Sequence, residues 1–139
     1  MSGKYENLIE RLYEDVWNEG NLDTADELVH DDYTIHDRDL AAELDGPEFY
    51  KALATGTRVV FPDAEFTIED IFVSGQKVAV RWEMTGTHKG EMLGIEPTGV
   101  EATLSAIEIN RFEDEKLIET WTQSDELGLM EQLNSLGAK

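Results

Sequence analysis

The chain has 139 residues, of which 40% are hydrophobic and 9% aromatic. This composition predicts one folded domain, spanning residues 1–139, that buries a core but leaves little room for a second. The sequence contains no cysteine, which excludes a disulfide framework, a thiolate nucleophile and a zinc site built from cysteines. Asp and Glu number 31 against 11 Lys and Arg, giving a formal charge of -20. A field of this sign repels nucleic acid and anionic membranes, so we expect neither as a partner.

The cellular setting can be narrowed from the charge and from the absence of membrane signals. The acidic residues are spread along the chain, which is consistent either with general solubility or with adaptation to a halophilic, high-salt cytoplasm where salt screens the self-repulsion. The sequence has no apolar run of about eighteen residues, and its N-terminus lacks a signal-peptide profile. We therefore expect a cytoplasmic protein.

The N-terminal part of the chain has the period of helices. Apolar residues recur at three- and four-residue spacing across Tyr5–Trp17 and predict an amphipathic helix that ends at Gly20. A second, short helix is expected to start near Asp23, whose side chain can cap it, and to run through Val29. Both helices need an apolar surface to cover.

A short strand and a third helix follow. The segment Tyr33–Asp37 alternates in polarity and predicts a strand that ends in the polar pair His36 and Asp37. A charged loop is expected over Arg38–Asp45. The next helix starts at Gly46-Pro47-Glu48, where proline fits because its missing N–H is not needed, and it ends before Pro62.

Beyond Pro62 the period changes to that of strands. Residues 66–72 alternate, and Gly75-Gln76 forms a hairpin turn into a strand over Lys77–His88. A glycine-rich loop over Lys89–Gly99 leads to the stretch around which we organise the sequence, Leu104–Met130. It predicts a strand, a tight turn, a second strand and a final helix that opens at Asp125. The order of elements indicates an α+β fold in which helices cover one face of a curved sheet.

Several segments in this order resemble the SnoaL-like cyclase group of the NTF2-like superfamily. They are EDVWNEGNLDTADELV, YTIHD, GPEFYKAL, VAVRWEMTGTHKGEMLGIEPTG and RFEDEKLIETWTQSDELGLMEQL. The resemblance covers nearly the whole chain. It implies a cone-shaped fold, with helices on the concave face of a curved, mixed and mostly antiparallel sheet around a deep pocket, commonly in a homodimer. Cyclases of this group close a ring in polyketide esters by an intramolecular aldol reaction without metal or cofactor.

The chemistry of such a pocket requires particular residue types. A proton is removed next to a carbonyl by a base, and the enolate oxygen needs a neutral hydrogen-bond donor nearby. Carboxyl groups can fill both roles if burial raises the pKa of one of them. Tyr13 lies on the inner stripe of the first helix, Asp37 ends the first strand, and Glu108 lies between Ile107 and Ile109, whose side chains point away from it on a strand.

The resemblance extends to roles for these residues. Related ketosteroid isomerases carry a tyrosine donor, an aspartate base and a protonated aspartate donor at the positions of Tyr13, Asp37 and Glu108. Each residue also has a plain structural interpretation, as a packing tyrosine, a loop aspartate or a glutamate in a surface ion pair. His36 and His88 are further titratable candidates beside expected pocket loops. The pocket walls are expected to include Trp17, Trp82, Met84 and Ile95.

The sequence departs from the family pattern at two places. The tryptophan of the last strand is usually followed by an aspartate, but Trp121 is followed by Thr122, which can hydrogen-bond a substrate but cannot act as a base. Either Glu108 or Asp37 then transfers the proton, or the aldol chemistry is absent. In the preceding turn Glu115 replaces the usual glycine, so we do not expect a left-handed backbone there.

Three functional classes remain open for a small carbonyl or polyketide-like ligand. They are a cofactor-independent cyclase or isomerase, a hydrolase or dehydratase that uses a bound water in the same pocket, and a non-catalytic binder of an apolar molecule. The sequence shows no metal-binding motif, so we expect neither a metal nor a cofactor. Ile107, Ile109 and Ile118 are expected on the sheet face away from the helices, which predicts a two-fold homodimer packed through the sheets.

Overall fold

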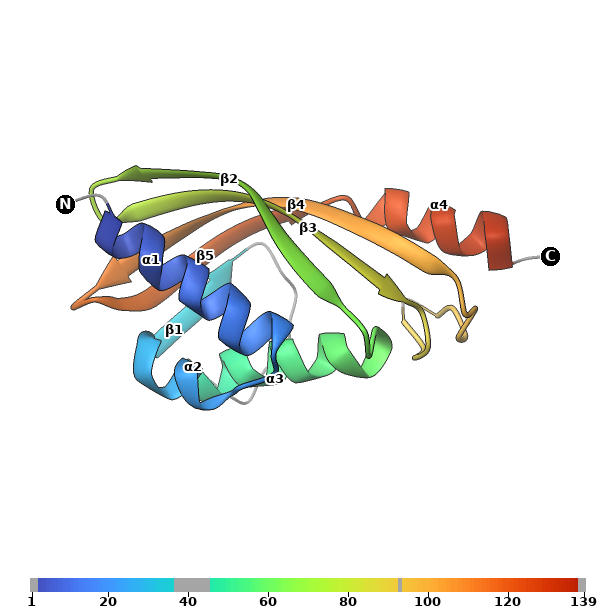
Figure 1. Cartoon of the computed structure of the whole chain (residues 1–139), viewed down its shortest axis with the longest axis horizontal. Coiled ribbons are helices and arrows are strands. Elements are labelled where there is room, and N and C mark those ends of the chain that lie inside the picture. The colour runs from blue at the N-terminus through green and yellow to red at the C-terminus, as the bar shows by residue number, and fades with distance from the viewer. Residues whose placement is uncertain (1–2, 37–45, 93, 138–139) are drawn as a thin grey trace.

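The computed structural model describes residues 3–36, 46–92 and 94–137. The helices and strands follow one another along the chain largely in the order that the sequence predicts (Figure 1). The helical elements are α1 (Gly3–Leu12), the π-helical segment η1 (Tyr13–Asn18), α2 (Asp23–Leu28), α3 (Gly46–Val60) and α4 (Glu126–Gly137). The strands are β1 (Val29–His36), β2 (Glu65–Ser74), β3 (Lys77–Thr87), β4 (Glu101–Glu113) and β5 (Lys116–Ser124).

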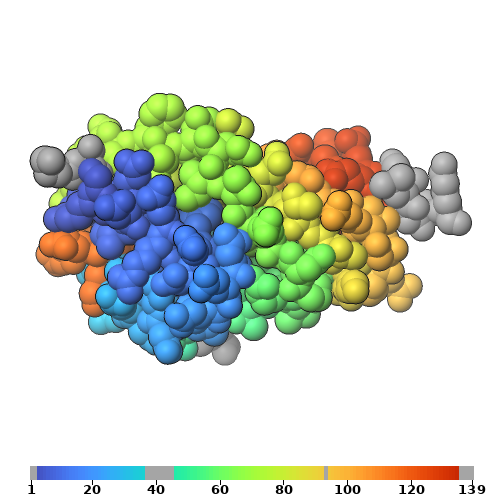
Figure 2. All heavy atoms as spheres, viewed as in Figure 1, coloured from blue at the N-terminus to red at the C-terminus, as the bar shows by residue number. Residues whose placement is uncertain are grey.

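The strands form one open, mixed sheet of five strands in the order β1-β5-β4-β3-β2. Only β1 runs parallel to its neighbour, β5, and the other pairs are antiparallel. The sheet curves over α1, α2 and α3, while α4 lies at one end beside β4 (Figure 1). The space-filling view shows atoms of α1 and α2 gathered at the opposite end of the molecule from α4 (Figure 2). The α+β class and the helix-covered, curved, mostly antiparallel sheet are therefore confirmed.

The first helical stretch is divided where the sequence predicts one continuous helix. The turn of η1 is wider than an α-helical turn, and the backbone N–H of Glu19 donates to the carbonyl of Glu14, five residues back, at 3.0 Å. Such wide turns occur often at functional sites. Gly20 ends the stretch as predicted, with a positive φ of 74° that glycine adopts without strain.

The boundaries of α2 and β1 differ from those expected. Asp23 does not cap α2; instead its own backbone N–H donates to Oδ1 of Asn21 at 3.3 Å. Val29 was expected in the helix but begins β1, where it is fully buried and pairs with Leu117 of β5. A β-branched residue suits this buried position on a strand. Asp37 and the loop 38–45 lie outside the described residues.

The core fills the space between the concave face of the sheet and the helices. Phe112 of β4 is fully buried and its ring lies 5.1 Å from that of Tyr5 in α1. The stripe of α1 and η1 supplies Ile9, Leu12 and Val16, each at most 1% exposed. Burying side chains of this size contributes about 1.5–3 kcal/mol each. None of the helices within the described ranges is long and apolar enough to span a bilayer.

The outer face of the sheet carries exposed apolar side chains. Two of the three isoleucines that the sequence places there are exposed, and the third is buried. Ile107 and Ile109 are 57% and 42% exposed, and Phe72 of β2 is 68% exposed. Ile118 was expected to be exposed with them but is only 8% exposed. The cause is a bulge. Phe112 pairs with Leu117 and the preceding β4 residue pairs with Glu119, so Ile118 has no partner in β4 and leaves the alternation of faces.

The turn between β4 and β5 contradicts the expectation of an unstrained backbone. Asp114 and Glu115 have φ angles of 53° and 62°, both in the left-handed region. Two such residues in succession are typical of the tight hairpin turn whose twist matches that of its strands. The turn geometry is imposed by the pairing of Glu113 with Lys116, so it persists although no glycine is present.

An alanine variant is usually more stable than a glycine variant at the same position. We predict the opposite at position 115, because the backbone there is left-handed. Glu115→Ala and Glu115→Gly both remove the exposed ion pair with Lys4, so their difference isolates the backbone. Because a side chain costs about 1–2 kcal/mol in this conformation, the glycine variant should unfold with a free energy about 1 kcal/mol higher than the alanine variant. Urea titration followed by circular dichroism measures this difference.

The control is the same pair of variants at Glu101, which starts β4 and has no positive φ. There glycine should be less stable than alanine. An alanine variant at 115 as stable as the glycine variant would contradict the assigned turn.

Candidate functional site

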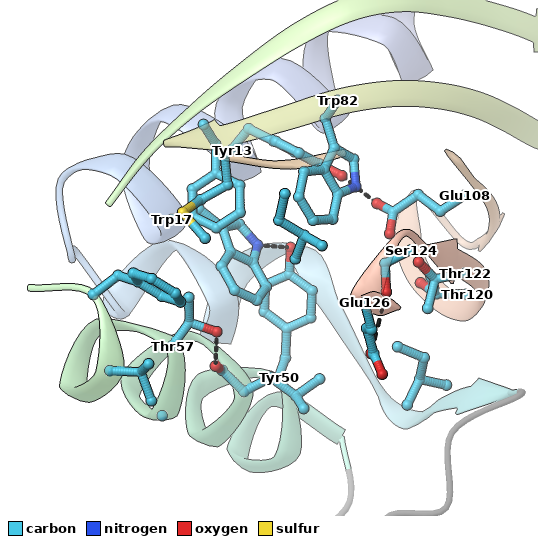
Figure 3. A pocket seen from close by; sticks show the side chains of 18 of the residues that line it. Tyr13, Trp17, Tyr50, Thr57, Trp82, Glu108, Thr120, Thr122, Ser124 and Glu126 are labelled. Carbon is cyan, nitrogen blue, oxygen red and sulfur yellow. Dashed lines mark hydrogen bonds between the residues drawn. The ribbon is translucent and has the colours of Figure 1, made fainter. Parts of the chain in front are cut away.

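A cavity of about 340 Å³ lies between the concave face of the sheet and the helices. Its size is near the lower end for small-molecule sites. Aromatic and aliphatic side chains from η1, α3, β2 and β3 make most of its wall, and the polar groups come mainly from β4 and β5 (Figure 3). The apolar lining includes Trp17, Tyr50, Leu53, Phe66, Trp82, Met84, Met92, Leu104 and Leu129.

Glu108 and Tyr13 form the central polar pair of this cavity. They are 95 residues apart in sequence, and the Tyr13 hydroxyl donates a short hydrogen bond to Oε1 of Glu108 (Figure 3). Tyr13, the first residue of η1, is 6% exposed. Glu108 lies on β4 between two outward-facing isoleucines, so the strand alternation directs its carboxyl into the cavity.

Burial shifts the proton affinities of both groups upward. The pKa of Glu108 is raised because burial penalises the charged carboxylate, and the hydrogen-bond donors of Tyr13, Asn110 and Trp82 offset part of that effect. The pKa of Tyr13 is raised well above its ordinary value, first by burial and then by the nearby Glu108. Tyr13 therefore remains a neutral donor at physiological pH, while Glu108 is a carboxyl group that accepts a proton more readily than usual.

The sequence analysis missed a chain of hydrogen bonds that continues from Glu108. Nδ2 of Asn110 lies 3.4 Å from Oε1 of Glu108, and Oδ1 of Asn110 accepts from the Thr120 hydroxyl at 2.8 Å. The Thr120 hydroxyl in turn accepts from that of Tyr33 at 3.0 Å. The alternation of strand residues could have revealed these two positions. Asn110 lies two residues after Glu108, and Thr120 lies two residues before Thr122, so each shares a strand face with that candidate residue.

The two cavity tryptophans differ in their hydrogen bonding. Nε1 of Trp17 donates to the hydroxyl of Tyr50 at 2.7 Å. Nε1 of Trp82 is buried and points toward Glu108 (Figure 3), but it makes no hydrogen bond of normal geometry to the described residues. A buried N–H donor that lacks a well-formed hydrogen bond is unfavourable, and an oxygen atom of a ligand beside Glu108 would satisfy it. The ring of Phe66 lies 5.2 Å from Trp17 and 5.3 Å from Trp82.

A second cluster of polar side chains lines the cavity where β5 ends and α4 begins. Thr122 is buried, lines the cavity and pairs across the sheet with Glu108. Ser124 donates to Oε2 of Glu126 at 3.2 Å, and both residues also line the cavity (Figure 3). Asp125 opens α4 as predicted, because its Oδ1 accepts from the backbone N–H of Gly128 at 2.9 Å.

Three of the candidate residues do not line the cavity. The ring of His36 stacks on Trp121 at 4.9 Å and its Nε2 lies 2.9 Å from Glu119, on the sheet face that carries Ile109. His88 is fully buried, and its Nδ1 contacts Thr98 at 3.0 Å. Ile95 pairs with Met92, and in this loop Met92 is the residue that reaches the cavity. Asp37, the expected base, lies outside the described residues.

A cluster of possible metal ligands occurs away from the cavity. His30, Glu113 and Asp114 are the only group of this kind in the described part of the chain, and none of them lines the cavity. Nδ1 of His30 accepts from the backbone N–H of Asp32 at 2.9 Å. The proton of the neutral imidazole is then on Nε2, which faces Glu113 at 3.7 Å. This tautomer directs a proton, not a lone pair, at the carboxylates, which disfavours a cation there.

The comparisons with known proteins agree with this fold. IdmH from Streptomyces antibioticus, a candidate polyketide cyclase, is 31% identical, with 94% of this chain and 98% of that one covered and a TM-score of 0.79. A candidate polyketide cyclase from Acidithiobacillus ferrooxidans is 30% identical, with 98% of both chains covered and a TM-score of 0.84. TsrD from Streptomyces laurentii is 27% identical over 98% of both chains, with a TM-score of 0.87.

The comparison with curated proteins finds no match. The family model for the SnoaL-like polyketide cyclase matches residues 7–133, which is nearly the whole chain. The region includes η1, the full sheet and most of α4, and hence every described residue that lines the cavity. The chain belongs to the SnoaL-like polyketide cyclase family.

Proposed function

We propose that the chain is a cofactor-independent cyclase or isomerase that acts on a small, polyketide-like carbonyl compound by general acid/base catalysis. The observation that carries this proposal is the carboxyl group of Glu108, which reaches into an apolar cavity beside the neutral hydroxyl of Tyr13. An ionisable group with a perturbed pKa in a cleft is a candidate for catalysis. Membership of a family of cyclases supports the same class of substrate.

Glu108 is the group that transfers the proton in this proposal. Burial raises its pKa above the ordinary value of a glutamate, which makes its carboxylate a stronger base for removing a proton next to a carbonyl. Tyr13 and Asn110 both donate to Oε1 and stabilise the ionised form, and Oε2 receives neither hydrogen bond.

The enolate oxygen formed in this step needs a donor close to Glu108. The indole N–H of Trp82 is buried, lacks a partner of normal geometry within the described residues and points to the same place. The hydroxyl of Tyr13 is a second donor if it turns from Glu108 toward the substrate. Preorganised donors of this kind stabilise developing charge more than they stabilise a neutral carbonyl.

The proposed reaction needs no further reactant. Glu108 takes a proton from the carbon next to one carbonyl, and the enolate carbon forms a bond to a second carbonyl carbon of the same molecule. The resulting alkoxide takes the proton back from Glu108, so all atoms are retained. In an isomerase the same proton would return to another carbon of the enolate. The small cavity limits either reaction to compact substrates.

The role of Asp37 as the base remains a prediction from the sequence. The threonine at position 122 leaves the β5 side of the cavity without the carboxylate expected there by resemblance. Thr122 lies across the sheet from Glu108 and can hydrogen-bond a substrate oxygen. The proposal therefore rests on Glu108, and Asp37→Asn separates the two assignments.

A non-catalytic binder of an apolar ligand is the alternative, and the apolar walls together with Thr122 favour it. The two functions differ in one respect that can be measured. Binding stabilises the native state whether or not the ligand reacts, whereas catalysis depends on the proton of Glu108. A hydrolase or dehydratase would need the same carboxyl group and a bound water, and it would release a second product.

We also propose that two copies associate through their sheets. The row of exposed side chains on the outer face includes Phe72, Ile107 and Ile109. Large exposed apolar patches often mark interfaces between proteins. The pairs Arg81–Asp70 and Arg111–Glu119 flank this row and neutralise charge there despite the acidic surface elsewhere.

The first prediction tests the catalytic role of Glu108. Carbonyl compounds and lipophilic acids that raise the melting temperature are first identified, and their conversion is followed by mass spectrometry. Glu108→Gln keeps shape and an acceptor oxygen but cannot transfer the proton, so turnover should fall by about 10²–10⁴-fold while binding persists. Asp37→Asn should reduce turnover similarly only if Asp37 is a second base.

The matched control is Glu83→Gln, the same chemical change at an exposed residue of β3, which should leave turnover unaltered. Equal turnover of Glu108→Gln and wild type would refute the proposed function, and a bound ligand that no variant converts would favour the binder.

The second prediction concerns stability and pH. The folded-state pKa of Glu108 is raised above that of the unfolded chain, so the folded protein binds this proton more tightly and stability falls as pH rises through the two pKa values. Glu108→Gln lacks this titration. The free energy of unfolding of the variant minus that of wild type should therefore become more positive as pH rises from acid to neutral. Urea titration at several pH values measures this difference.

Glu119→Gln is a control for which we expect the opposite dependence of stability on pH. The pKa of Glu119 is lowered by hydrogen bonds to His36 and Arg111, so Glu119 contributes stability above its unfolded pKa that is lost as pH falls. Glu119→Gln should become less stable relative to wild type as pH rises. The same sign for both variants would show that Glu108 is not held in a buried site.

The third prediction tests the dimer. Light scattering at micromolar concentration should give the mass of two copies for wild type, and Ile109→Glu should give one copy because it places a charge in the apolar row. Val59→Glu introduces the same charge at a 66% exposed residue of α3 and should remain a dimer. A wild-type monomer would refute association through the sheets.

A further inference from the structure

A chain of hydrogen bonds leads from the carboxyl group of Glu108 into the protein. We call it the Asn110 network, and it consists of Glu108, Asn110, Thr120 and Tyr33, from β4, β5 and β1. Asn110, Thr120 and Tyr33 are each only 2% exposed. Polar groups buried to this extent must find partners within the protein.

The protons of the network determine which way the amide of Asn110 faces. The Tyr33 hydroxyl gives its proton to Oγ1 of Thr120, and the Thr120 hydroxyl gives its own to Oδ1 of Asn110. The carbonyl of the amide therefore faces Thr120. Its NH₂ group faces Oε1 of Glu108 at 3.4 Å, where a donor favours the ionised carboxylate.

The same heavy atoms can also form the network in the opposite direction. When Glu108 is protonated on Oε1, the oxygen that faces Asn110, this O–H can donate to Oδ1 of Asn110 once the amide turns by half a rotation. Nδ2 then donates to Oγ1 of Thr120, and the Thr120 hydroxyl donates to that of Tyr33. Tyr33 lines the cavity, so its proton becomes available to an oxygen atom there. Each buried member has a partner in both directions.

We propose that Asn110 is a positioning residue for Glu108, whose amide is oriented by Thr120 and Tyr33 to hold the carboxylate and turns when Glu108 takes up a proton. The network thus serves Glu108 both before and after the proton transfer. This inference rests on the proposed function for its catalytic meaning, but the network itself can be tested without a substrate.

Other titratable groups around Glu108 do not explain such a switch. Tyr13 from η1, Tyr33 from β1 and Tyr50 from α3 interact with it electrostatically, and burial raises the pKa of all three hydroxyls, so they stay neutral. Glu126 of α4 lines the same cavity and hydrogen-bonds Ser124. Among these described side chains, Asn110 and Tyr13 donate to the carboxylate, and both hydrogen bonds end on Oε1.

The test is the titration of Glu108 by ¹³C NMR of side-chain carboxyl groups, with the resonance assigned by its loss in Glu108→Gln. Asn110→Leu removes the donor and should move the titration midpoint upward by roughly one pH unit, since the lost hydrogen bond favours the ionised carboxylate. Thr120→Val leaves Asn110 in place but removes the hydroxyl that orients it, so the midpoint should rise by a smaller amount.

Thr24→Val is the matched control. Thr24 is a buried threonine whose hydroxyl makes one side-chain hydrogen bond, to Asp15 at 2.8 Å, and it does not line the cavity. The Glu108 midpoint should not move in this variant. If Asn110→Leu does not fold, Thr120→Val decides the question alone, because valine has nearly the volume of threonine.

An unchanged midpoint in the folded network variants, or an equal rise in Thr24→Val, would overturn the inference. These outcomes are independent of the proposed function. If Glu108→Gln retains full turnover while Asn110→Leu shifts the midpoint, the network stands and the catalytic role of Glu108 does not. If turnover depends on Glu108 but the midpoint is unaffected, the function stands and the positioning role of Asn110 fails.

Discussion

The burial of one carboxyl group, that of Glu108, is the constraint on which the cavity depends. A carboxylate taken out of water is costly unless hydrogen bonds replace its hydration. Tyr13 and Asn110 supply such bonds from a helix and from the same strand. Burial nevertheless dominates, because the pKa of the carboxyl is raised in spite of these donors. The cavity therefore holds a carboxyl group whose proton affinity is increased, and the side chains that donate to it, Tyr13 and Asn110, are both uncharged.

The fold creates this environment by placing a curved sheet over three helices. Strand alternation on β4 and β5 aligns Glu108, Asn110, Thr120 and Thr122 on the concave face. The wide turn of η1 places Tyr13 and Trp17 against that face, where both line the cavity. The outer face carries a different set of residues, including the ion pair of Arg111 with Glu119. The two faces of one sheet thus separate the candidate chemistry from the surface proposed for association.

The SnoaL-like family supplies the class of function but not the substrate. Related structures include candidate polyketide cyclases and AclR from Streptomyces galilaeus, a candidate hydroxylase 25% identical to this chain. A shared fold supports different reactions when the side chains of the pocket differ. In this chain Thr122 pairs with Glu108 across the sheet, so the carboxyl group of this pair of positions lies on β4 and not on β5.

The sequence by itself determined the order of helices and strands, the α+β class and the inward direction of Glu108, because these follow from local periods of 3.6 and 2 residues. Only the tertiary structure decided which distant residues meet. Tyr13 and Glu108 are 95 residues apart, and Tyr33 joins Thr120 because β1 lies parallel to β5. It also directed His36 to the outer face and imposed a left-handed turn on Glu115. Strand pairing and register fix these outcomes, and the local pattern of the chain determines neither of them.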